Sequence, residues 1–165
     1  MHQDSFQTAL GPIGFYLAAR RPVRARVLAL LVLASCIALL TIAGRLQPDS
    51  SGVGTHRQLG FPPCLPIALF GYPCPTCGMT TAFAHGVRGH IIAAFNAQPA
   101  GLAAALLTIL ATGLSLGVIA TGNVWIPNWY RLRPERVAVG LVLFILGAWA
   151  YKLITGVMDG TLPYR

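Results

Sequence analysis

The chain contains little charge and very few acidic side chains. Only 10% of its 165 residues are charged, whereas a soluble domain usually carries about 25%. Four Asp and Glu stand against 12 Lys and Arg, and the sequence holds no carboxylate pair, no phosphate-binding loop and no Ser/His/Asp set. These absences exclude the enzyme classes that depend on such groups. A chain with so little polar surface is also suited to lipid rather than to water.

The net charge of +8 would also fit a nucleic-acid-binding protein. The arginines, however, cluster beside apolar segments and do not follow one face with aromatic residues between them. Charge that flanks apolar segments is typical of membrane proteins. We therefore expect a lipid bilayer, and no nucleic acid, as the partner of this chain.

Three apolar segments, at about 27–44, 99–121 and 137–158, approach the length that crosses a bilayer. The first would span roughly 27 Å as a helix, close to a hydrocarbon core of about 30 Å. Lys152 lies near the end of the third, where its ammonium would reach the membrane interface. Aromatic residues that suit interfacial anchors flank this third segment, namely Trp125, Trp129 and Tyr164. The sequence predicts an all-α integral membrane protein with three transmembrane helices.

The arginines favour one orientation in the membrane. Seven of them lie before the first span or between the second and third: Arg20, Arg21, Arg24, Arg26, Arg131, Arg133 and Arg136. The longer stretch 45–98 holds only Arg45, Arg57 and Arg88. The positive-inside rule then predicts a cytoplasmic tail at 1–26 and a single membrane domain at 27–165. We expect the inner membrane of a bacterium, with the C-terminus outside and Arg88 touching lipid headgroups.

Two short patterns in the spans each have two interpretations. Leu33–Cys36 resembles a lipobox, but the apolar run continues past Cys36, which favours a spanning helix with a buried cysteine. Gly113 and Gly117 form a small-xxx-small pattern. The two glycines would serve either internal packing or contact with a second copy or a partner membrane protein.

The other three cysteines lie in a Gly/Pro-rich region between the first two spans. We call residues 61–98 the cap and residues 64–78, which hold Cys64, Cys74 and Cys77, the Cys elbow. We expect the elbow to face outward. A short helix is expected from Cys77, followed by a second that starts at Ile91 and runs through a kink at Pro99 into the second span.

Metal binding is one interpretation of the elbow. Two cysteines spaced as Cys74 and Cys77 can grip one ion, as in zinc ribbons. Cys64 would be the third ligand, and His85, His90 or His56 the fourth. The sequence contains no second Cys-x-x-Cys, so it supplies only half of a ribbon.

Thiol–disulfide chemistry is the second interpretation. A Cys-x-x-Cys pair at the start of a helix has a lowered thiol pKa, because the helix N-terminus favours the thiolate. Cys74 and Cys77 would be the redox pair and Cys64 a resolving thiol. Against this, the sequence shows no thioredoxin-like βαβ pattern.

A structural role is the third interpretation, in which the cysteines are small buried residues or form a plain disulfide. Since no catalytic set is complete, the leading hypothesis is a non-enzymatic membrane component with a structural or interaction cap. The alternatives are a membrane thiol–disulfide oxidoreductase using Cys74 and Cys77, and a metal-binding cap with zinc as the candidate ion.

The elbow also resembles a bacterial membrane-protein family, the domain of unknown function (DUF) family 2752. The resemblance rests on Gly71-Tyr-Pro-Cys74-Pro-Thr-Cys77-Gly78-Met-Thr80, on the Cys64 that precedes it, and on Arg88-Gly89 and Asn96-Ala-Gln-Pro99 that follow. It covers about a quarter of the chain and implies a membrane architecture but no reaction. The chain departs from the family pattern at Thr81, usually Arg, and at His90, usually acidic, where it would cap a helix poorly.

Overall fold

Three long helices dominate the computed structural model, which describes residues 15–18, 22–127 and 133–163. These helices are α1 (Pro22–Arg45), α5 (Pro99–Thr121) and α7 (Pro134–Met158). Each is long and apolar enough to cross a membrane. The predicted helical membrane architecture with three spans is therefore confirmed, with each helix beginning at or before the expected residue.

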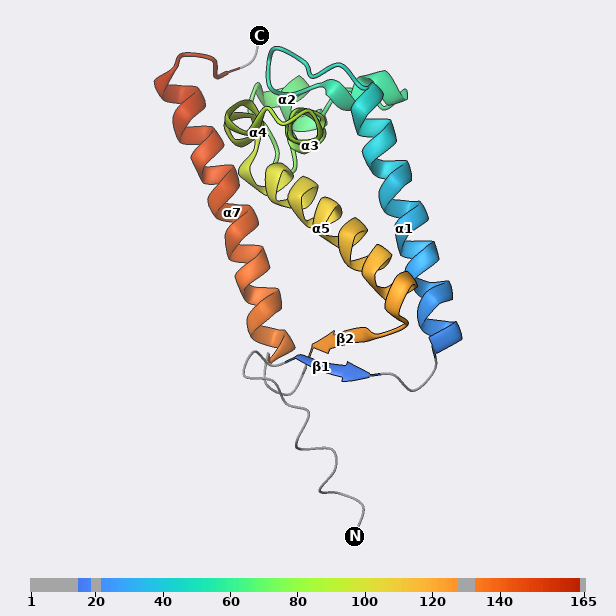
Figure 1. The fold of residues 1–165 in the computed structure, drawn as a ribbon. Helices are drawn as coiled ribbons and strands as arrows, with labels where there is room; N and C mark the ends of the chain where they lie inside the picture. The colour runs from blue at the N-terminus through green and yellow to red at the C-terminus, as the bar shows by residue number, and fades with distance from the viewer. Residues whose placement is uncertain (1–14, 19–21, 128–132, 164–165) are drawn as a thin grey trace.

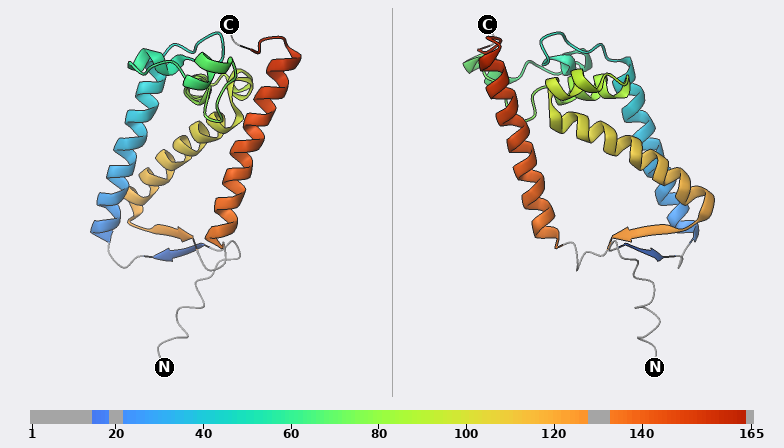
Figure 2. Two further views of the ribbon diagram at one scale, coloured as in Figure 1. Left: turned by 180° about the vertical axis from the view of Figure 1, so that it is seen from behind. Right: turned by 60° about the vertical axis from the view of Figure 1, so that its left-hand side comes forward.

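The long helices form an open frame with the cap at one end (Figures 1 and 2). Helix α5 leans between the other two, so that it packs on α1 away from the cap and meets α7 near the cap. The first turns of α1 and α7 lie at the end opposite the cap (Figure 1). Arg24, Arg26, Arg133 and Arg136 therefore share that end. Arg20, Arg21 and Arg131 lie outside the described residues.

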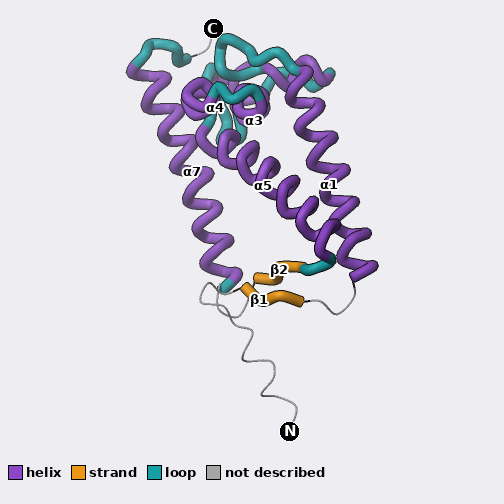
Figure 3. Tube along the Cα trace, viewed as in Figure 1, coloured by secondary structure: helices purple, strands orange, loops and turns teal. Residues whose placement is uncertain are grey.

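A small antiparallel sheet closes the end away from the cap (Figure 3). Strand β1 (Phe15–Ala18) pairs with β2 (Val124–Pro127), and Phe15 lies opposite Pro127. These strands are not expected from the sequence, because each is only four residues long and its partner lies about a hundred residues away. Of the expected aromatic anchors, Trp125 lies in β2, and Trp129 and Tyr164 fall outside the described residues.

The cap contains three short helices, α2 (Leu65–Phe70), α3 (Met79–Val87) and α4 (Ile91–Ala97), and a 3-10 helix at Thr55–Leu59 precedes it. Helices α3 and α4 pack on the first turns of α5. The expected continuous helix through Pro99 is instead two helices, because Gln98 is extended (φ −169°, ψ 114°). A proline disfavours helical geometry in the residue before it and suits the first turn of a new helix.

Arg88 connects the cap to α1 and does not point to lipid, contrary to the sequence expectation. Its guanidinium donates hydrogen bonds to the carbonyls of Ala43 (3.2 Å), Gly44 (2.8 Å) and Leu46 at the end of α1, and to Ala84 (2.7 Å) of α3. The last carbonyls of a helix have no intrahelical donor. Arg88 thus supplies, from 42 to 45 residues away, the donors that the end of α1 lacks.

The two expected features of the spans have different outcomes. Cys36 is buried and α1 continues past it, so the expected spanning helix with a buried cysteine is confirmed. A Cβ added at Gly113 or Gly117 would meet nothing within 4 Å. Within the described residues these two glycines therefore do not serve close internal packing.

Candidate functional site

Three thiols meet in the Cys elbow. The Sγ atoms of Cys74 and Cys77 are 2.9 Å apart, those of Cys64 and Cys77 3.0 Å, and those of Cys64 and Cys74 3.5 Å. None of these cysteines is in a disulfide. They form the group of potential metal ligands found in the described part of the chain. We call these three residues the thiol cluster.

The local sequence explains how the cluster forms. Cys64 is the N-cap of α2, and this helix ends at Gly71, whose left-handed conformation (φ 75°) reverses the chain. The reversal brings Cys74 back beside Cys64. A turn closed by the hydrogen bond from Cys77 N to Cys74 O (3.0 Å) then places both sulfurs on the same side. Glycine suits such a reversal, because a left-handed residue with a Cβ is strained.

Three donors from outside the elbow fix its backbone, and two of them, Gln98 and Lys152, are buried. Every second carbonyl of residues 73–77 accepts one hydrogen bond. Pro73 O accepts from Trp149 Nε1 (2.8 Å), Pro75 O from Gln98 Nε2 (2.9 Å) and Cys77 O from Lys152 Nζ (3.3 Å). The segment 71–78 forms neither a helix nor a strand, and its prolines have no N–H to donate. Its carbonyls therefore need donors from elsewhere. The roles of Trp149 and Gln98 were not evident from the sequence, since nothing in their own segments points to the elbow.

Lys152 lies inside the protein and does not extend to the membrane interface as the sequence analysis expected. It is only 6% exposed. Besides Cys77 O, its ammonium donates to the carbonyls of Ala97 (2.7 Å) and Gly52 (3.1 Å). These carbonyls come from α4 and from the loop after α1. One side chain of α7 therefore joins two segments of the cap and the loop after α1, which are 55 to 100 residues away.

Gly78 is the residue after the cluster and the N-cap of α3. Its φ of 90° lies in the region that favours glycine. A Cβ here would come within 2.7 Å of both Ala97 O and Gly52 O and would also collide with the ammonium of Lys152. Gly78 therefore leaves the space in which the Lys152 ammonium and its acceptor carbonyls meet.

The cysteines of the Cys-x-x-Cys pair differ in acidity. Burial opposes ionisation of Cys74, but hydrogen bonds from Cys77 and Thr76 outweigh it and lower the pKa of Cys74 to about 7. Burial, together with hydrogen bonds to the other two thiols, raises the pKa of Cys77. The cluster without metal therefore carries its first negative charge on Cys74.

The histidines proposed as a fourth ligand lie outside the thiol cluster, whose ligand group among the described residues consists of the three cysteines alone. His85 and His90 approach each other, with ring centroids 5.9 Å apart. Burial and the nearby charges of His90 and Arg88 lower the pKa of His85. His56 Nε2 is instead 3.1 Å from Pro62 O.

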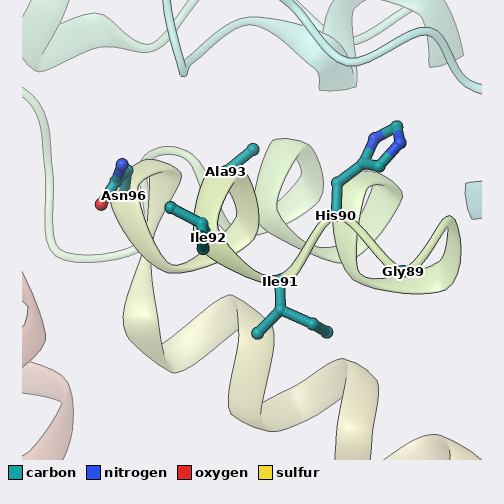
Figure 4. A pocket seen from close by; sticks show the side chains of 6 residues that line it. All are labelled: Gly89, His90, Ile91, Ile92, Ala93 and Asn96. Atoms are coloured by element: carbon teal, nitrogen blue, oxygen red, sulfur yellow. The ribbon is translucent and has the colours of Figure 1, made fainter.

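A shallow pocket of about 570 Å³ lies away from the cysteines, on the turn before α4 and on α4 itself. It is lined by Gly89, His90, Ile91, Ile92, Ala93 and Asn96. Figure 4 shows that His90 and Asn96 point in different directions. Since its polar groups do not converge, this pocket has no feature of a catalytic site.

The fold and the cluster define a class: a helical membrane protein with three spans and three thiols in the cap between the first two. Residues 64–112 match the family described as protein of unknown function (DUF2752), which confirms the family resemblance seen in the sequence. The match covers the elbow, α3, α4 and the first part of α5. No curated protein and no solved structure matches the chain.

At the two positions where the chain departs from the family pattern, the side chains differ in their roles. Thr81 is buried, and its Oγ1 is 2.8 Å from Oγ1 of Thr55. This bond ties α3 to the 3-10 helix. His90 is the N-cap of α4 and makes no side-chain capping hydrogen bond, as expected for a residue in place of an acidic one.

Proposed function

We propose that this protein is a non-enzymatic membrane protein whose cap is organised by a thiophilic metal ion bound to Cys64, Cys74 and Cys77. One observation carries the proposal: the sulfur of Cys64, at the start of α2, and the two sulfurs of the Cys74–Cys77 turn lie 2.9 to 3.5 Å apart. Sulfurs around one zinc ion lie roughly 3.7 Å apart at a Zn–S distance of about 2.3 Å. Each pair would separate by less than about 1 Å to accept the ion.

The rest of the cap supports a structural role for the ion. A disulfide would use two of the three thiols and leave the third beside it, whereas a soft metal ion uses all three. Of the side chains in α2, none is buried, so this helix has little apolar packing to fix it. A metal ion can replace such packing, because the free energy of binding becomes free energy of folding.

The first test is the metal content of the protein purified in detergent without a chelator. We expect about one zinc ion per chain, the number that one cluster of this kind takes. Cys64→Ser and Cys77→Ser should lose this zinc, whereas Cys36→Ser should keep it, since Cys36 lies in α1. A Cys74–Cys77 disulfide trapped by acid and alkylation in cells would contradict the metal proposal.

A second candidate, a thiol–disulfide oxidoreductase, is favoured by the lowered pKa of Cys74 beside Cys77. The Cys74 thiolate would attack a substrate disulfide and release one substrate thiol. Cys77 would then displace the second substrate thiol and leave a Cys74–Cys77 disulfide. Reduction of a model disulfide by the purified reduced protein, lost in Cys74→Ser, would favour this candidate over the metal site.

The reactivity of Cys74 should depend on pH in the metal-free, reduced protein. Only the thiolate is alkylated, so the rate should rise with pH, reach half its maximum near pH 7 and level off above. An unperturbed thiol would reach this point at about pH 8.5. Mass spectrometry after iodoacetamide treatment measures the rate, and Cys77→Ala should raise the midpoint by removing a donor. A midpoint near 8.5 in the unmodified chain would contradict the hydrogen-bonded arrangement.

We also propose that the protein lies in the inner membrane of a bacterium with its N-terminus in the cytoplasm and its cap outside. Four arginines at the end opposite the cap support this orientation through the positive-inside rule, namely Arg24, Arg26, Arg133 and Arg136. A reporter enzyme that works only outside the cytoplasm should be active when fused to the C-terminus. An inactive fusion beside an active cytoplasmic reporter would reverse the orientation.

A further inference from the structure

The Lys152 ammonium is a buried charge whose neighbours are carbonyl groups. Its three acceptors, the carbonyls of Gly52, Cys77 and Ala97, are neutral. No carboxylate of the described residues forms an ion pair with it. A buried charge is costly unless an opposite charge accompanies it, and in a membrane span such a residue usually has an identifiable partner.

The acidic residues of the described chain lie elsewhere. Asp49 accepts hydrogen bonds from Ser51, Glu135 lies in the first turn of α7 at the opposite end, and Asp159 follows the last turn of this helix and is exposed. The Lys152 ammonium instead reaches the thiol cluster, where it donates to the carbonyl of Cys77 (3.3 Å). The thiol cluster is thus the source of negative charge available to this ammonium among the described residues.

We propose that Lys152 is the counter-ion of a three-thiolate metal site, and that its positive charge makes the site favour a divalent ion over a monovalent one. This inference rests on the proposed metal-binding function and deepens it. Three thiolates with a divalent ion carry one negative charge, which Lys152 neutralises. A monovalent ion would leave one negative charge uncompensated in a partly buried site, where uncompensated charge is costly.

The geometry makes Lys152 a positioning residue and not a ligand. Its ammonium donates to the carbonyl of Cys77, so it acts on the cluster through the backbone and through its charge. Trp149, one turn earlier on α7, donates to Pro73 O on the other side of Cys74. Residues that orient the ligands of a metal in this way typically change metal affinity when they are replaced.

The test measures zinc affinity of the full-length protein in detergent by competition with a chelator. Lys152→Gln retains a hydrogen-bond donor without the charge, and Lys152→Arg retains the charge with a different shape. We expect zinc binding to weaken roughly 10- to 100-fold in Lys152→Gln and clearly less in Lys152→Arg. Tyr151→Phe, at the neighbouring position of α7, is the matched control and should bind like the unmodified protein.

The outcomes separate this inference from the function on which it rests. If the unmodified protein binds no zinc through its cysteines, the proposed function is wrong. If it binds zinc and Lys152→Gln binds equally well, or better than Lys152→Arg, Lys152 is not the counter-ion and only this inference is overturned.

A second pair of variants keeps the test decisive if Lys152→Gln does not fold. In a chain with all three cluster cysteines replaced by serine, the ammonium has no anion beside it. Lys152→Met should then lower the unfolding temperature less in that background than in the zinc-loaded protein, because only the hydrogen bonds to the three carbonyls are lost there. A decrease of equal size in both backgrounds would assign Lys152 to hydrogen bonding alone and would overturn the proposal.

Discussion

The Gly78→Ala variant is expected to lose about 3 kcal/mol or more of its free energy of unfolding, together with its zinc. A methyl group would meet the carbonyl oxygens of Ala97 and Gly52 at 2.7 Å and would displace the ammonium of Lys152. The positive φ adds backbone strain for any residue with a Cβ. Thermal unfolding in detergent and the metal content of the same sample measure the two effects.

Gly89→Ala is the matched control for this variant. Gly89 also has a positive φ, of 77°, but a Cβ there would meet nothing within 4 Å. This variant should therefore show only the backbone strain, which is about 1 kcal/mol, and should keep its zinc. Equal losses in the two variants would mean that the contacts around Gly78 contribute nothing beyond the backbone conformation.

The membrane architecture could be predicted from the sequence because its signal is local. An uncharged run such as 27–44 needs no knowledge of its neighbours to be read as a spanning helix. The spacing of Cys74 and Cys77 is local in the same sense, and Cys64 precedes them by only one short helix. The three cysteines that these local patterns single out are the ones that meet in the thiol cluster.

The roles of Arg88 and Lys152 could not be predicted, because their partners are distant in the sequence. General rules for cationic side chains near membrane interfaces assigned both to lipid contact. The structure instead places Lys152 on carbonyls up to 100 residues away and Arg88 on carbonyls up to 45 residues away. A pattern within one helix holds no information about which distant carbonyls lack donors.

In the cap, a proline-rich segment leaves backbone carbonyls that need hydrogen-bond donors from distant residues. Pro73 and Pro75 carry carbonyls that regular structure does not satisfy, and Trp149 and Gln98 donate to them. The sequence does show that these carbonyls need donors, since proline cannot continue a helix or sheet. It does not show which of the available donors lies nearby, and this is why the sequence analysis found the elbow but not its supports.

The Arg88→Met variant is expected to lose about 3 kcal/mol or more of the free energy of unfolding, because a hydrogen bond from a charged group contributes about 1.5–3 kcal/mol and Arg88 makes several, one of them exposed. Methionine keeps the length of the apolar stem but donates nothing to the carbonyls of Ala43, Gly44 and Leu46. The end of α1 should then separate from α3. Thermal unfolding measures the loss, and cross-linking between cysteines introduced at the ends of α1 and α3 measures the separation.

Two further variants show whether the geometry of the guanidinium is responsible. Arg88→Lys keeps the charge, but one ammonium cannot reach four acceptors spread over two helices, so its stability should lie between those of the unmodified chain and Arg88→Met. Arg45→Met removes an exposed charge from the same end of α1 and should change little. If Arg88→Met costs no more than Arg45→Met, other contacts fix the cap to α1. If it costs more, two cationic side chains fix the loop after α1. Arg88 binds the carbonyl of Leu46 at its start, and Lys152 binds the carbonyl of Gly52.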